Sequence, residues 1–559
     1  MGSECEFALK SHSAIERGKP FLLIIMDGWG ENLEDDYNGV YMAGTGFLKS
    51  LKAGYPDRWR TIKAHGTAVG LPSDADMGNS EVGHNAMGAG KVINQGAALV
   101  DTALANGNIF TDAGFEYIKE AFDNGGTLHL IGLLSDGGVH SRYDQLDLFM
   151  RGAHERGANK IRVHPLTDGR DVPDGSSVQF VEQLEKDLAD LRAKGCDARI
   201  ASGGGRMHVT MDRYEADWKI VERGWHAHVL GEAPHKFQSA LEALVELKKA
   251  DPKVNDQYYP PWVIVDEDGE AVGPVQDGDA VVIFNFRADR VVELSKAFEY
   301  PDFDKFDRVR YPKVHFVGMM QYDGDLKLPA RYLVTPPVIE KTSGVYLVKN
   351  GVRTFACSET QKFGHVTFFW NGNRSGKLDD KLETYFEVPS DLCPFNEKPL
   401  MKAREIRDAA KAAILSGKHD YIRINFANGD MVGHTGVFDA VLDACSVVDE
   451  CVKDLVDAID SVGGSYMITA DHGNADDMVQ RNKKKEPLRD ENGNPLPLTS
   501  HTLAPVPVMI GGPALPSNVR FRRDLPKAGL ANITATFMNM LGFEAPSDYE
   551  PTLLEVVSV

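Results

Sequence analysis

The sequence predicts an α/β protein with mainly parallel sheets, arranged as two domains. Short apolar runs alternate along the chain with helical stretches, which is the pattern of parallel strands covered by helices. These runs fall into two sets, because some lead into Asp and His and the others lead into Arg and His. The chain has 559 residues, enough for roughly two to four domains of ordinary size. We therefore expect two sheets with two kinds of chemistry.

The first set of strands is expected to end at a metal-type site. Its three apolar runs lead into acidic residues: Phe21–Met26 into Asp27, Tyr421–Phe426 into Ala-Asn-Gly-Asp430, and Ser465–Ala470 into Asp471-His472. Ligands of open α/β sheets bind beyond the carboxyl ends of the strands, so these three ends are predicted to converge. Further along, apolar residues from Val441 to Ile459 keep a spacing of three or four, which predicts a helix packed on this sheet.

The second set of strands is expected to form an inserted domain. Its members are Leu128–Leu134 before His140, Ile161–His164 before Asp168-Gly-Arg170-Asp171, Ala198–Ala201 before Arg206, and Val281–Phe286 before Arg287 and Arg290. The arginines lie between the metal-type residues along the chain, which is why an insertion is predicted. We place the first domain at residues 1–92 and 337–559 and the inserted domain at 96–333. Hinges between the domains are expected near residues 90–96 and 333–338, where Gly88-Ala-Gly90 and Pro336-Pro337 would be a loose and a stiff connection.

Charge and composition exclude several functions. Lys and Arg total 61 and Asp and Glu total 82, so the net charge is −21 with His neutral. This excess argues against a nucleic acid or a membrane as partner, because both require basic surface. No apolar run reaches the roughly 18 residues of a membrane span, and the N-terminus does not read as a signal peptide. The six scattered cysteines are expected to be reduced thiols of a cytoplasmic protein.

Acidic residues and histidines form two candidate metal-binding sets. Asp430 and His434 are four residues apart on a predicted helical turn, so both side chains can reach one ion. Alone this spacing is more often structural, and the same holds for Asp471-His472 and for His501. Together with Asp27 they supply oxygen and nitrogen ligands without Cys, which suits a pair of borderline or hard divalent ions. The ligand types leave Mn²⁺, Co²⁺, Mg²⁺ and Zn²⁺ open.

Ser80 is the candidate nucleophile. It lies in the segment Asp76-Met-Gly-Asn-Ser80-Glu-Val-Gly-His84, where a small turn would expose its hydroxyl and helix-forming residues follow. Free backbone N–H groups at the start of a helix stabilise a bound phosphate. A neighbouring metal ion would lower the pKa of the hydroxyl, as it lowers that of bound water.

Eight motifs resemble those of the cofactor-independent phosphoglycerate mutases, and they occur in family order over nearly the whole chain. They are Met26–Gly30, Met77–His84, Ser135–Ser141, Asp168–Asp171, Phe284–Arg290, Ser358–Phe369, Asn428–Gly436 and Thr469–Asn474. Extra loops near residues 245–262 and 482–497 look more like the plant and trypanosomatid branch than the shorter bacterial one. The polar segment 482–497 also reads as an exposed loop.

The resemblance implies an alkaline-phosphatase-like domain in two segments with an inserted phosphotransferase domain. It further implies an isomerase of glycolysis and gluconeogenesis that interconverts 3-phosphoglycerate and 2-phosphoglycerate through a phosphoserine at Ser80, independently of 2,3-bisphosphoglycerate. Two divalent ions are implied as cofactors, with Mn²⁺ first and Co²⁺ or Mg²⁺ as alternatives. The expected partner is the small-molecule substrate, and a monomer is expected.

Site residues carry over from the same motifs. One metal ion would bind Asp27, Ser80, Asp471 and His472, and the other would bind Asp430, His434 and His501. Substrate contacts would be His140, Arg170, Asp171, Arg206, Arg213, Arg287, Arg290 and Lys362. Of all these residues, Ser80, Asp171, His140 and Lys362 would be catalytic. One departure affects Arg206, because the chain carries one more residue between it and Arg213 than common bacterial members do.

The residue chemistry agrees with this reading and leaves rivals open. Guanidinium groups match both the carboxylate and the phosphate of a phosphoglycerate by paired hydrogen bonds. A metal-dependent phosphomonoesterase would not need so many arginines in an inserted domain, and a sulfatase needs a formylglycine precursor where this chain has Ser80. A phosphopentomutase typically uses threonine as nucleophile. A metal-stabilised binding protein would need neither the nucleophile nor both metal sets.

Overall fold

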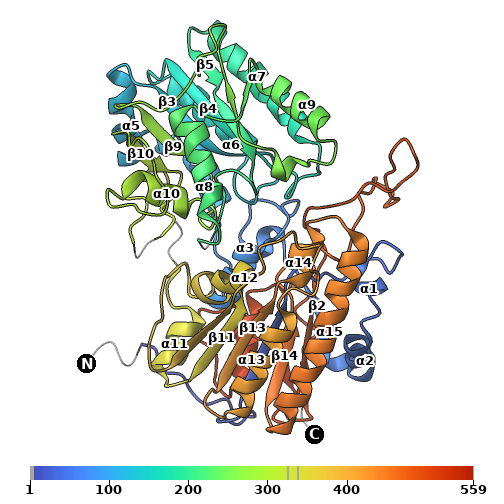
Figure 1. Ribbon diagram of the computed structural model, residues 1–559. Coiled ribbons are helices and arrows are strands. Elements are labelled where there is room, and N and C mark those ends of the chain that lie inside the picture. The colour runs from blue at the N-terminus through green and yellow to red at the C-terminus, as the bar shows by residue number, and fades with distance from the viewer. Residues whose placement is uncertain (1–5, 214, 324–325, 336–338, 558–559) are drawn as a thin grey trace. The chain divides into compact units, whose positions relative to one another are not determined.

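The computed structural model describes residues 6–213, 215–323, 326–335 and 339–557. These residues divide into two compact units, one made of residues 1–95 and 338–559 and the other of residues 96–337 (Figure 1). Each unit has its own sheet and its own core, so each is described by itself. Pro336 and Pro337, expected at the stiff connection, lie outside the described residues.

Unit 1 is built on a seven-stranded sheet of order β12-β11-β13-β1-β14-β15-β2. Its strands are β1 (Phe21–Met26), β2 (Trp59–Ile62), β11 (Thr354–Glu359), β12 (Glu383–Val388), β13 (Tyr421–Phe426), β14 (Ser465–Thr469) and β15 (Val506–Gly511). The strands from β12 to β14 run parallel, and β15 is antiparallel to its neighbours β14 and β2. Every residue of β1 is buried, as its unbroken apolar run requires of a strand covered on both faces.

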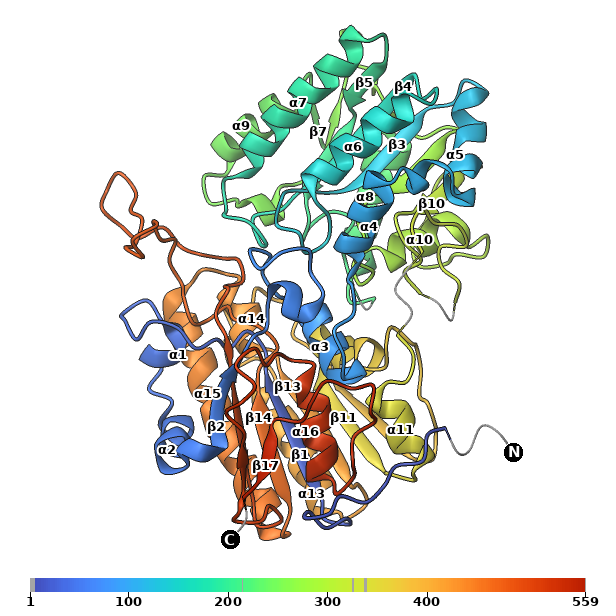
Figure 2. The same ribbon diagram turned by 180° about the vertical axis from the view of Figure 1, so that it is seen from behind.

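Helices cover both faces of this sheet. The longer ones are α2 (Gly46–Gly54), α3 (Ser80–Ala89), α11 (Ser343–Lys349), α13 (Ala403–Leu415), α15 (Phe438–Ser461) and α16 (Asn532–Met540). Helices α13 and α15 lie on one face and α16 lies on the other (Figures 1 and 2). Phe537 of α16 packs on Phe21 and Tyr421, with ring centroids 6.2 and 5.2 Å away. The helix predicted from the spacing of Val441 to Ile459 is α15.

Unit 2 is built on an eight-stranded sheet of order β10-β9-β3-β4-β6-β8-β7, with β5 paired to β4. Its strands are β3 (Leu128–Leu134), β4 (Lys160–Thr167), β5 (Asp197–Ile200), β6 (Ser202–Gly205), β7 (His235–Phe237), β8 (Trp262–Ile264), β9 (Ala280–Ile283) and β10 (His315–Gly318). Its longer helices are α4 (Gly96–Ala105), α5 (Ala113–Asp123), α6 (Tyr143–His154), α7 (Ser177–Ala193), α8 (Trp218–Trp225), α9 (Ala240–Ala250) and α10 (Val292–Glu299). The strands from β10 to β6 are parallel. The predicted α/β class is confirmed.

Two expectations about local structure are wrong. The strand predicted to reach Phe286 ends at Ile283, because the chain then leaves the ladder and the Phe286 N–H donates to the carbonyl of His140 at 2.8 Å. The Gly88-Ala-Gly90 segment is not loose, since Gly88 is buried in α3 and a Cβ there would lie 2.0 Å from the carbonyl oxygen of Trp370. Gly88 therefore serves the close packing of α3 against the Trp370 backbone.

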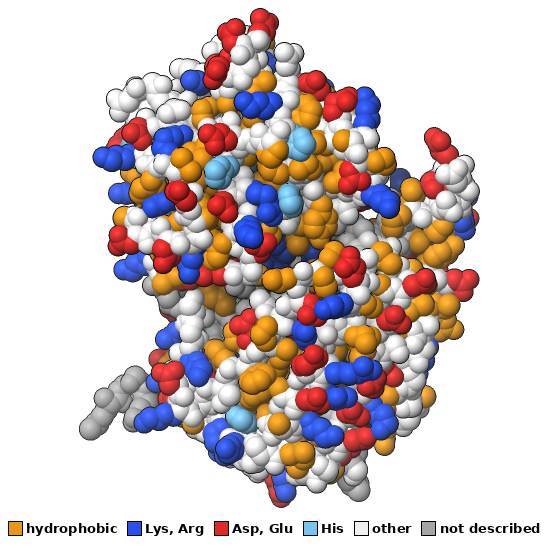
Figure 3. Space-filling view, viewed as in Figure 1, with side chains coloured by type: hydrophobic (Ala, Val, Ile, Leu, Met, Phe, Trp, Pro, Cys, Tyr) orange, Lys and Arg blue, Asp and Glu red, His pale blue; other side chains and the backbone are white. Residues whose placement is uncertain are grey.

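The structure also describes the surface charge, the cysteines, the loop at residues 482–497 and the length of the helices. The face shown in Figure 3 mixes acidic and basic side chains. All cysteines from Cys196 onward are free thiols, and Cys5 lies outside the described residues. Segment 482–497 is an almost entirely exposed loop with isolated bridges. Among the described residues, none of the helices combines the length and apolar character that a membrane crossing requires.

Candidate active site

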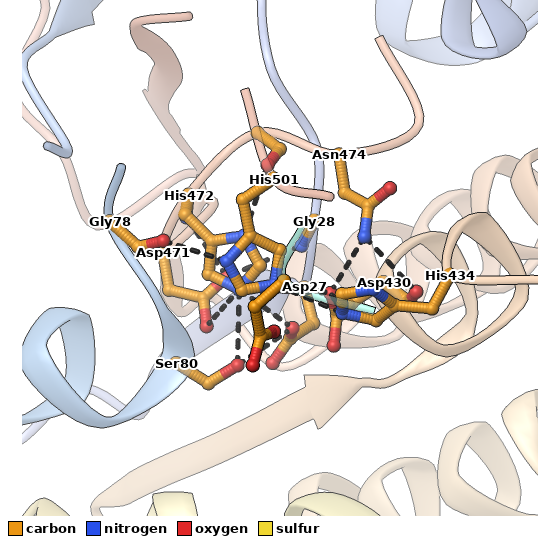
Figure 4. A network of polar contacts seen from close by, with 12 residues as sticks. Asp27, Gly28, Gly78, Ser80, Asp430, His434, Asp471, His472, Asn474 and His501 are labelled. Carbon is orange, nitrogen blue, oxygen red and sulfur yellow. Dashed lines mark hydrogen bonds and ion pairs between the residues drawn. The ribbon is translucent and has the colours of Figure 1, made fainter. Parts of the chain in front are cut away.

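The unit 1 sheet brings the metal-type residues together at the carboxyl ends of three strands. Strands β13, β1 and β14 are adjacent and parallel, so the chain leaves all three at the same edge. Asp27 follows β1, Asp430 lies in α14 (Asn428–Gly433) after β13, and Asp471 and His472 come after β14. These four residues are buried, and Figure 4 shows that their side chains point toward one another.

The start of α3 delivers Ser80 to the same place. Asn79 caps the helix by accepting a hydrogen bond from the Val82 N–H at 3.1 Å, which fixes Ser80 as the first helical residue. The chain before the cap passes close to a neighbouring segment, since a Cβ on Gly78 would lie 1.9 Å from the carbonyl oxygen of Ala64. Gly78 is therefore required for this approach.

The Ser80 hydroxyl is surrounded by charged groups. Its Oγ lies 3.2 Å from Asp27 Oδ1 and 3.1 Å from His472 Nε2. Lys362, expected as a substrate contact, also lies here: its Nζ donates to Ser80 Oγ and is 2.6 Å from Asp27 Oδ1 and 2.7 Å from Asp430 Oδ2. Burial alone would raise the pKa of Asp27, but Lys362 and His472 hold it well below its usual value. The carboxylates of this cluster therefore need neighbouring cations to stay ionised.

Asp430, His434 and His501 form a second group beside the first. The Nε2 atoms of His434 and His501 are 2.9 and 3.1 Å from Asp430 Oδ1 and 3.0 Å from each other. His434 Nδ1 donates to the Thr499 carbonyl at 2.6 Å and His501 Nδ1 donates to the Gly78 carbonyl at 2.7 Å. In neutral rings both Nε2 atoms then carry lone pairs, which repel at this distance unless a cation binds them. Backbone carbonyls orient metal-binding histidines in this way.

Asp471 supplies a further test of whether a metal ion fits. Its Oδ1 accepts from the backbone N–H of Gly28 at 3.3 Å and of His472 at 3.1 Å. Its Oδ2 is buried, and no described residue donates a hydrogen bond to it. Burial and the neighbouring Asp27 raise the pKa of Asp471 to about 7. An unsatisfied carboxylate oxygen beside a second carboxylate is a donor set that a divalent cation satisfies.

His84 belongs to this cluster but was not predicted. It is close enough to Asp27 and Asp471 to form part of a metal-binding group. However, its Nδ1 donates to the Ser80 carbonyl at 2.7 Å and its Nε2 accepts from Asn425 at 3.3 Å, so neither nitrogen is left for an ion. Burial lowers the pKa of His84 to about 3, which keeps it neutral. The available signal was its place four residues after Ser80, on the same helix face.

Two asparagines that were not predicted donate hydrogen bonds to carboxylates of this cluster. Asn425 Nδ2 donates to Asp27 Oδ2 at 2.8 Å, and Asn474 Nδ2 donates to Asp430 Oδ1 at 2.9 Å. Both asparagines are buried. They fix the carboxylate orientations that a metal ion would meet.

In unit 2, a separate cluster forms around Asp171. Arg206 contacts the Asp171 carboxylate and places its Nη1 2.7 Å from Asp168 Oδ1. Asp168 also accepts from the Ser135 hydroxyl at 2.6 Å, so this pair is held firmly. His140 Nε2 lies 3.9 Å from Asp171 Oδ2. Arg206, whose match to the family motif is less secure than that of Arg213, therefore lies inside the cluster.

Asp289 is the second carboxylate centre of unit 2, and it was not singled out from the sequence. Arg287 binds it with two hydrogen bonds, Nε to Oδ1 at 2.9 Å and Nη2 to Oδ2 at 3.2 Å. Arg213 Nη1 lies 3.3 Å from Oδ2, and His140 Nδ1 lies 3.7 Å from Oδ1. Burial would raise the pKa of Asp289, but Arg287 and Arg213 lower it to about 2. Burial and the surrounding arginines hold the pKa of His140 well below its ordinary value.

Arg290 shows that positive charge is in excess here. Its Nη1 donates to the Met211 carbonyl at 2.7 Å, and no described residue accepts a hydrogen bond from its buried Nη2. Burial and the positive charges of Arg213, Arg206 and Arg170 lower the pKa of Arg290 well below its usual value. An anion with several oxygen atoms would relieve this repulsion and accept hydrogen bonds from the N–H groups that lack an acceptor.

All the sequence-predicted site residues therefore fall into two clusters, one in each unit. The unit 1 cluster contains Asp27, Ser80, Lys362, Asp430, His434, Asp471, His472 and His501, and the unit 2 cluster contains His140, Arg170, Asp171, Arg206, Arg213, Arg287 and Arg290. A serine among metal-type ligands and a cluster of buried arginines are the features of phosphoryl-transfer chemistry. The family model described as Metalloenzyme superfamily matches residues 19–545, so the fold and site define a metalloenzyme of that superfamily.

Known proteins place the chain more narrowly. The 2,3-bisphosphoglycerate-independent phosphoglycerate mutase of Mesembryanthemum crystallinum is 64% identical over 560 residues, covering 100% of both chains. That of Trypanosoma brucei brucei is 60% identical over 549 residues, covering 98% of this chain and 99% of that protein. A crystal structure of Leishmania mexicana phosphoglycerate mutase at low cobalt concentration matches with a TM-score of 0.97 and 59% identity, covering 98% of this chain and 100% of that one. The chain belongs to the 2,3-bisphosphoglycerate-independent phosphoglycerate mutase family, which confirms the resemblance seen in the sequence.

Proposed function

We propose that this protein interconverts 3-phosphoglycerate and 2-phosphoglycerate through a phosphoserine at Ser80, with two divalent metal ions and without 2,3-bisphosphoglycerate. The observation that carries the proposal is the setting of Ser80 Oγ, which lies at the start of a helix and within 3.2 Å of Asp27 and His472. The names of the full-length relatives support the substrate pair.

The ligand assignment follows the two groups of side chains. One ion would bind Asp27, Ser80, Asp471 and His472, and the other would bind Asp430, His434 and His501. Support comes from the buried Asp471 Oδ2 without a donor and from the facing Nε2 atoms of His434 and His501. Mn²⁺ is our first candidate, with Co²⁺ or Mg²⁺ as alternatives, because the ligands are oxygen and nitrogen. Bound metal would favour the ionised form of the serine hydroxyl and offset phosphate charge.

Lys362 and the helix start would stabilise the transferred phosphoryl group. Ser80 Oγ forms a bond to phosphorus while the bond from phosphorus to the substrate oxygen breaks, and the freed glycerate oxygen takes a proton. Lys362 Nζ already donates to Ser80 Oγ and would neutralise charge on it. The N-terminal end of α3 would donate backbone N–H hydrogen bonds to phosphate oxygens.

Unit 2 would hold the glycerate and move its proton. The arginines Arg170, Arg206, Arg213, Arg287 and Arg290 would bind the carboxylate and phosphate by paired hydrogen bonds. Asp171 would act as general acid and base for the 2- and 3-hydroxyl groups, assisted by the neutral imidazole of His140. Glycerate that stays bound while it reorients receives the phosphoryl group back on its other hydroxyl.

The proposal requires the two units to close around one substrate and exclude water from the phosphoserine. We assign the phosphatase-like role to unit 1 and the phosphotransferase role to unit 2. Small-angle scattering is expected to show compaction when metal and 3-phosphoglycerate are added together. An unchanged radius of gyration during full turnover would contradict closure.

The decisive experiment follows products from 3-phosphoglycerate in the absence of 2,3-bisphosphoglycerate. We expect 2-phosphoglycerate to form without release of inorganic phosphate. Chelation should stop the reaction and added Mn²⁺ should restore it. Release of inorganic phosphate in place of 2-phosphoglycerate would instead identify a phosphomonoesterase.

A further inference from the structure

A chain of hydrogen bonds runs through the interior of unit 2, outside the arginine cluster. It consists of Asp279 Oδ2 to His129 Nε2 at 3.1 Å, His129 Nδ1 to His164 Nε2 at 2.9 Å, His164 Nδ1 to Ser202 Oγ at 2.6 Å, Ser202 Oγ to His228 Nδ1 at 2.7 Å, and His228 Nε2 to Thr210 Oγ1 at 2.8 Å. All six residues are buried. The proposed reaction uses none of them.

One carboxylate sets the direction of every bond in this chain. Asp279 only accepts, so His129 donates to it from Nε2 and must accept at Nδ1 if the ring is neutral. His164 therefore donates from Nε2 and accepts at Nδ1 from the Ser202 hydroxyl. The Ser202 oxygen then accepts from His228 Nδ1, which leaves His228 Nε2 as the acceptor of the last bond. Burial lowers the pKa of each of the three histidines, in agreement with neutral rings.

The last donor in the chain is the hydroxyl of Thr210. This residue has a φ of 71°, a left-handed conformation that is strained for a β-branched side chain. Such strain persists only where the surroundings impose it. The Thr210 N–H donates to the Ile220 carbonyl at 2.8 Å, so backbone and side chain are both held.

The strained conformation has a direct link to the arginine cluster. Residue 211 follows at once, and the Met211 carbonyl accepts the hydrogen bond of Arg290 Nη1 at 2.7 Å. Arg213 lies two residues further on and contacts Asp289 at 3.3 Å. The hydrogen bonds that hold the backbone at Thr210 therefore act directly before the residue whose carbonyl binds the Arg290 guanidinium.

We propose that Thr210 and His228 are positioning residues for substrate binding: the buried chain from Asp279 holds the backbone at 210 so that the Met211 carbonyl aligns Arg290. This inference rests on the proposed function, because Arg290 matters here as a ligand of the substrate anion. It predicts a loss of substrate affinity, and not of the chemical step, when the chain is broken at its last bond.

The test compares Thr210→Val with Thr210→Ser. Valine keeps the branched shape but removes the hydroxyl, so we expect the KM for 3-phosphoglycerate to rise about tenfold, the scale of one lost buried hydrogen bond, with kcat nearly unchanged. Serine keeps the hydroxyl and should restore the wild-type KM. Ser295→Ala is the matched control, because it removes a buried hydroxyl of unit 2 that bonds only within its own helix, and it should leave KM unchanged.

A second measurement reports the chain itself. Nitrogen-15 NMR of histidine-labelled protein should find the ring proton on Nε2 of His129 and His164 and on Nδ1 of His228. An Nε2 proton on His228 would overturn the inference, as would an unchanged KM in Thr210→Val. A wild-type protein that fails to isomerise 3-phosphoglycerate would refute the proposed function and this inference together, whereas unchanged kinetics of Thr210→Val in an active enzyme would refute the inference alone.

Discussion

Asp471 of unit 1 and Asp289 of unit 2 lie in opposite electrostatic surroundings. In unit 1, burial and the neighbouring Asp27 raise the pKa of Asp471 to about 7. In unit 2, Arg287 and Arg213 overcome the effect of burial and lower the pKa of Asp289 to about 2. Asp471 therefore lies in an excess of negative charge, and Asp289 lies in an excess of positive charge.

This difference indicates what each cluster must bind. Carboxylates crowded with histidine lone pairs call for cations, and crowded guanidinium groups call for an anion. Variants of the two units should accordingly differ in whether added metal restores them. The following predictions test that contrast.

The largest effect is expected at the proposed nucleophile. Ser80→Ala should lose at least about 10⁴-fold in activity, the scale seen when a covalent nucleophile is removed, while it still binds metal. Intact-mass analysis of enzyme quenched during turnover should find phosphate on the wild type only. Ser343→Ala is the matched control, because Ser343 is also a buried first residue of a helix in unit 1, and it should remain active. Phosphate on another residue would contradict the assignment.

Replacing the proposed acid and base in unit 2 should have the next largest effect. Asp171→Asn is expected to lower kcat by about 10²–10⁴-fold, because proton transfer to glycerate is lost. Metal content should stay the same, and excess Mn²⁺ should not restore activity. Asp187→Asn alters another buried carboxylate of unit 2 and should change activity little. Recovery of Asp171→Asn activity with added metal would contradict the proposed difference between the clusters.

A smaller effect is expected at Asn474, which contacts a proposed metal ligand. Asn474→Ala removes the donor to Asp430 Oδ1 and should weaken metal binding by about 10–100-fold, the usual cost of losing an outer partner. Activity should return when the Mn²⁺ concentration is raised, which titration of metal-free enzyme would show. Activity that stays low at saturating metal would mean that Asn474 acts on something other than metal binding.

The smallest effect concerns stability. The pKa of Asp289 in the folded protein, about 2, lies below its ordinary value of 3.8, so its ionised form stabilises the fold above pH 3.8. Wild type should exceed Asp289→Asn by about 2 kcal/mol in unfolding free energy at pH 7. This difference should shrink as the pH falls through 3.8 towards 2, as urea unfolding at several pH values would show. A difference that is independent of pH would contradict the charge argument.

The sequence was informative where one run of residues carries the whole signal. Phe21–Met26 is buried throughout, so its apolar run and the Asp27 that follows it could be read directly. The end of β9 was misjudged, because Phe284 and Phe286 are apolar although the strand ends at Ile283 and the Phe286 N–H bonds to His140, outside the strands. Gly88 was misread because a packing glycine and a flexible glycine look alike in sequence.

Partners that are distant along the chain could not be predicted. Asn425 orients Asp27 although 398 residues separate them, and nothing local distinguishes it from other strand residues. His129 and His164 look like single histidines in apolar strands, and only the pairing of β3 with β4 brings them together. The direction of their hydrogen bonds also depends on Asp279, which lies directly before β9.

The discontinuity of unit 1 has a consequence for the order of biosynthesis. Strand β1 pairs only with β13 and β14, so one of the first strands to leave the ribosome must wait for two of the last. The candidate ligands extend from Asp27 to His501, so the proposed metal sites can be completed only near the end of translation. Residues 96–337 form a continuous segment with its own core, which can fold while the remainder is still being made. The nascent chain would thus contain a folded arginine cluster before the proposed nucleophile site has formed.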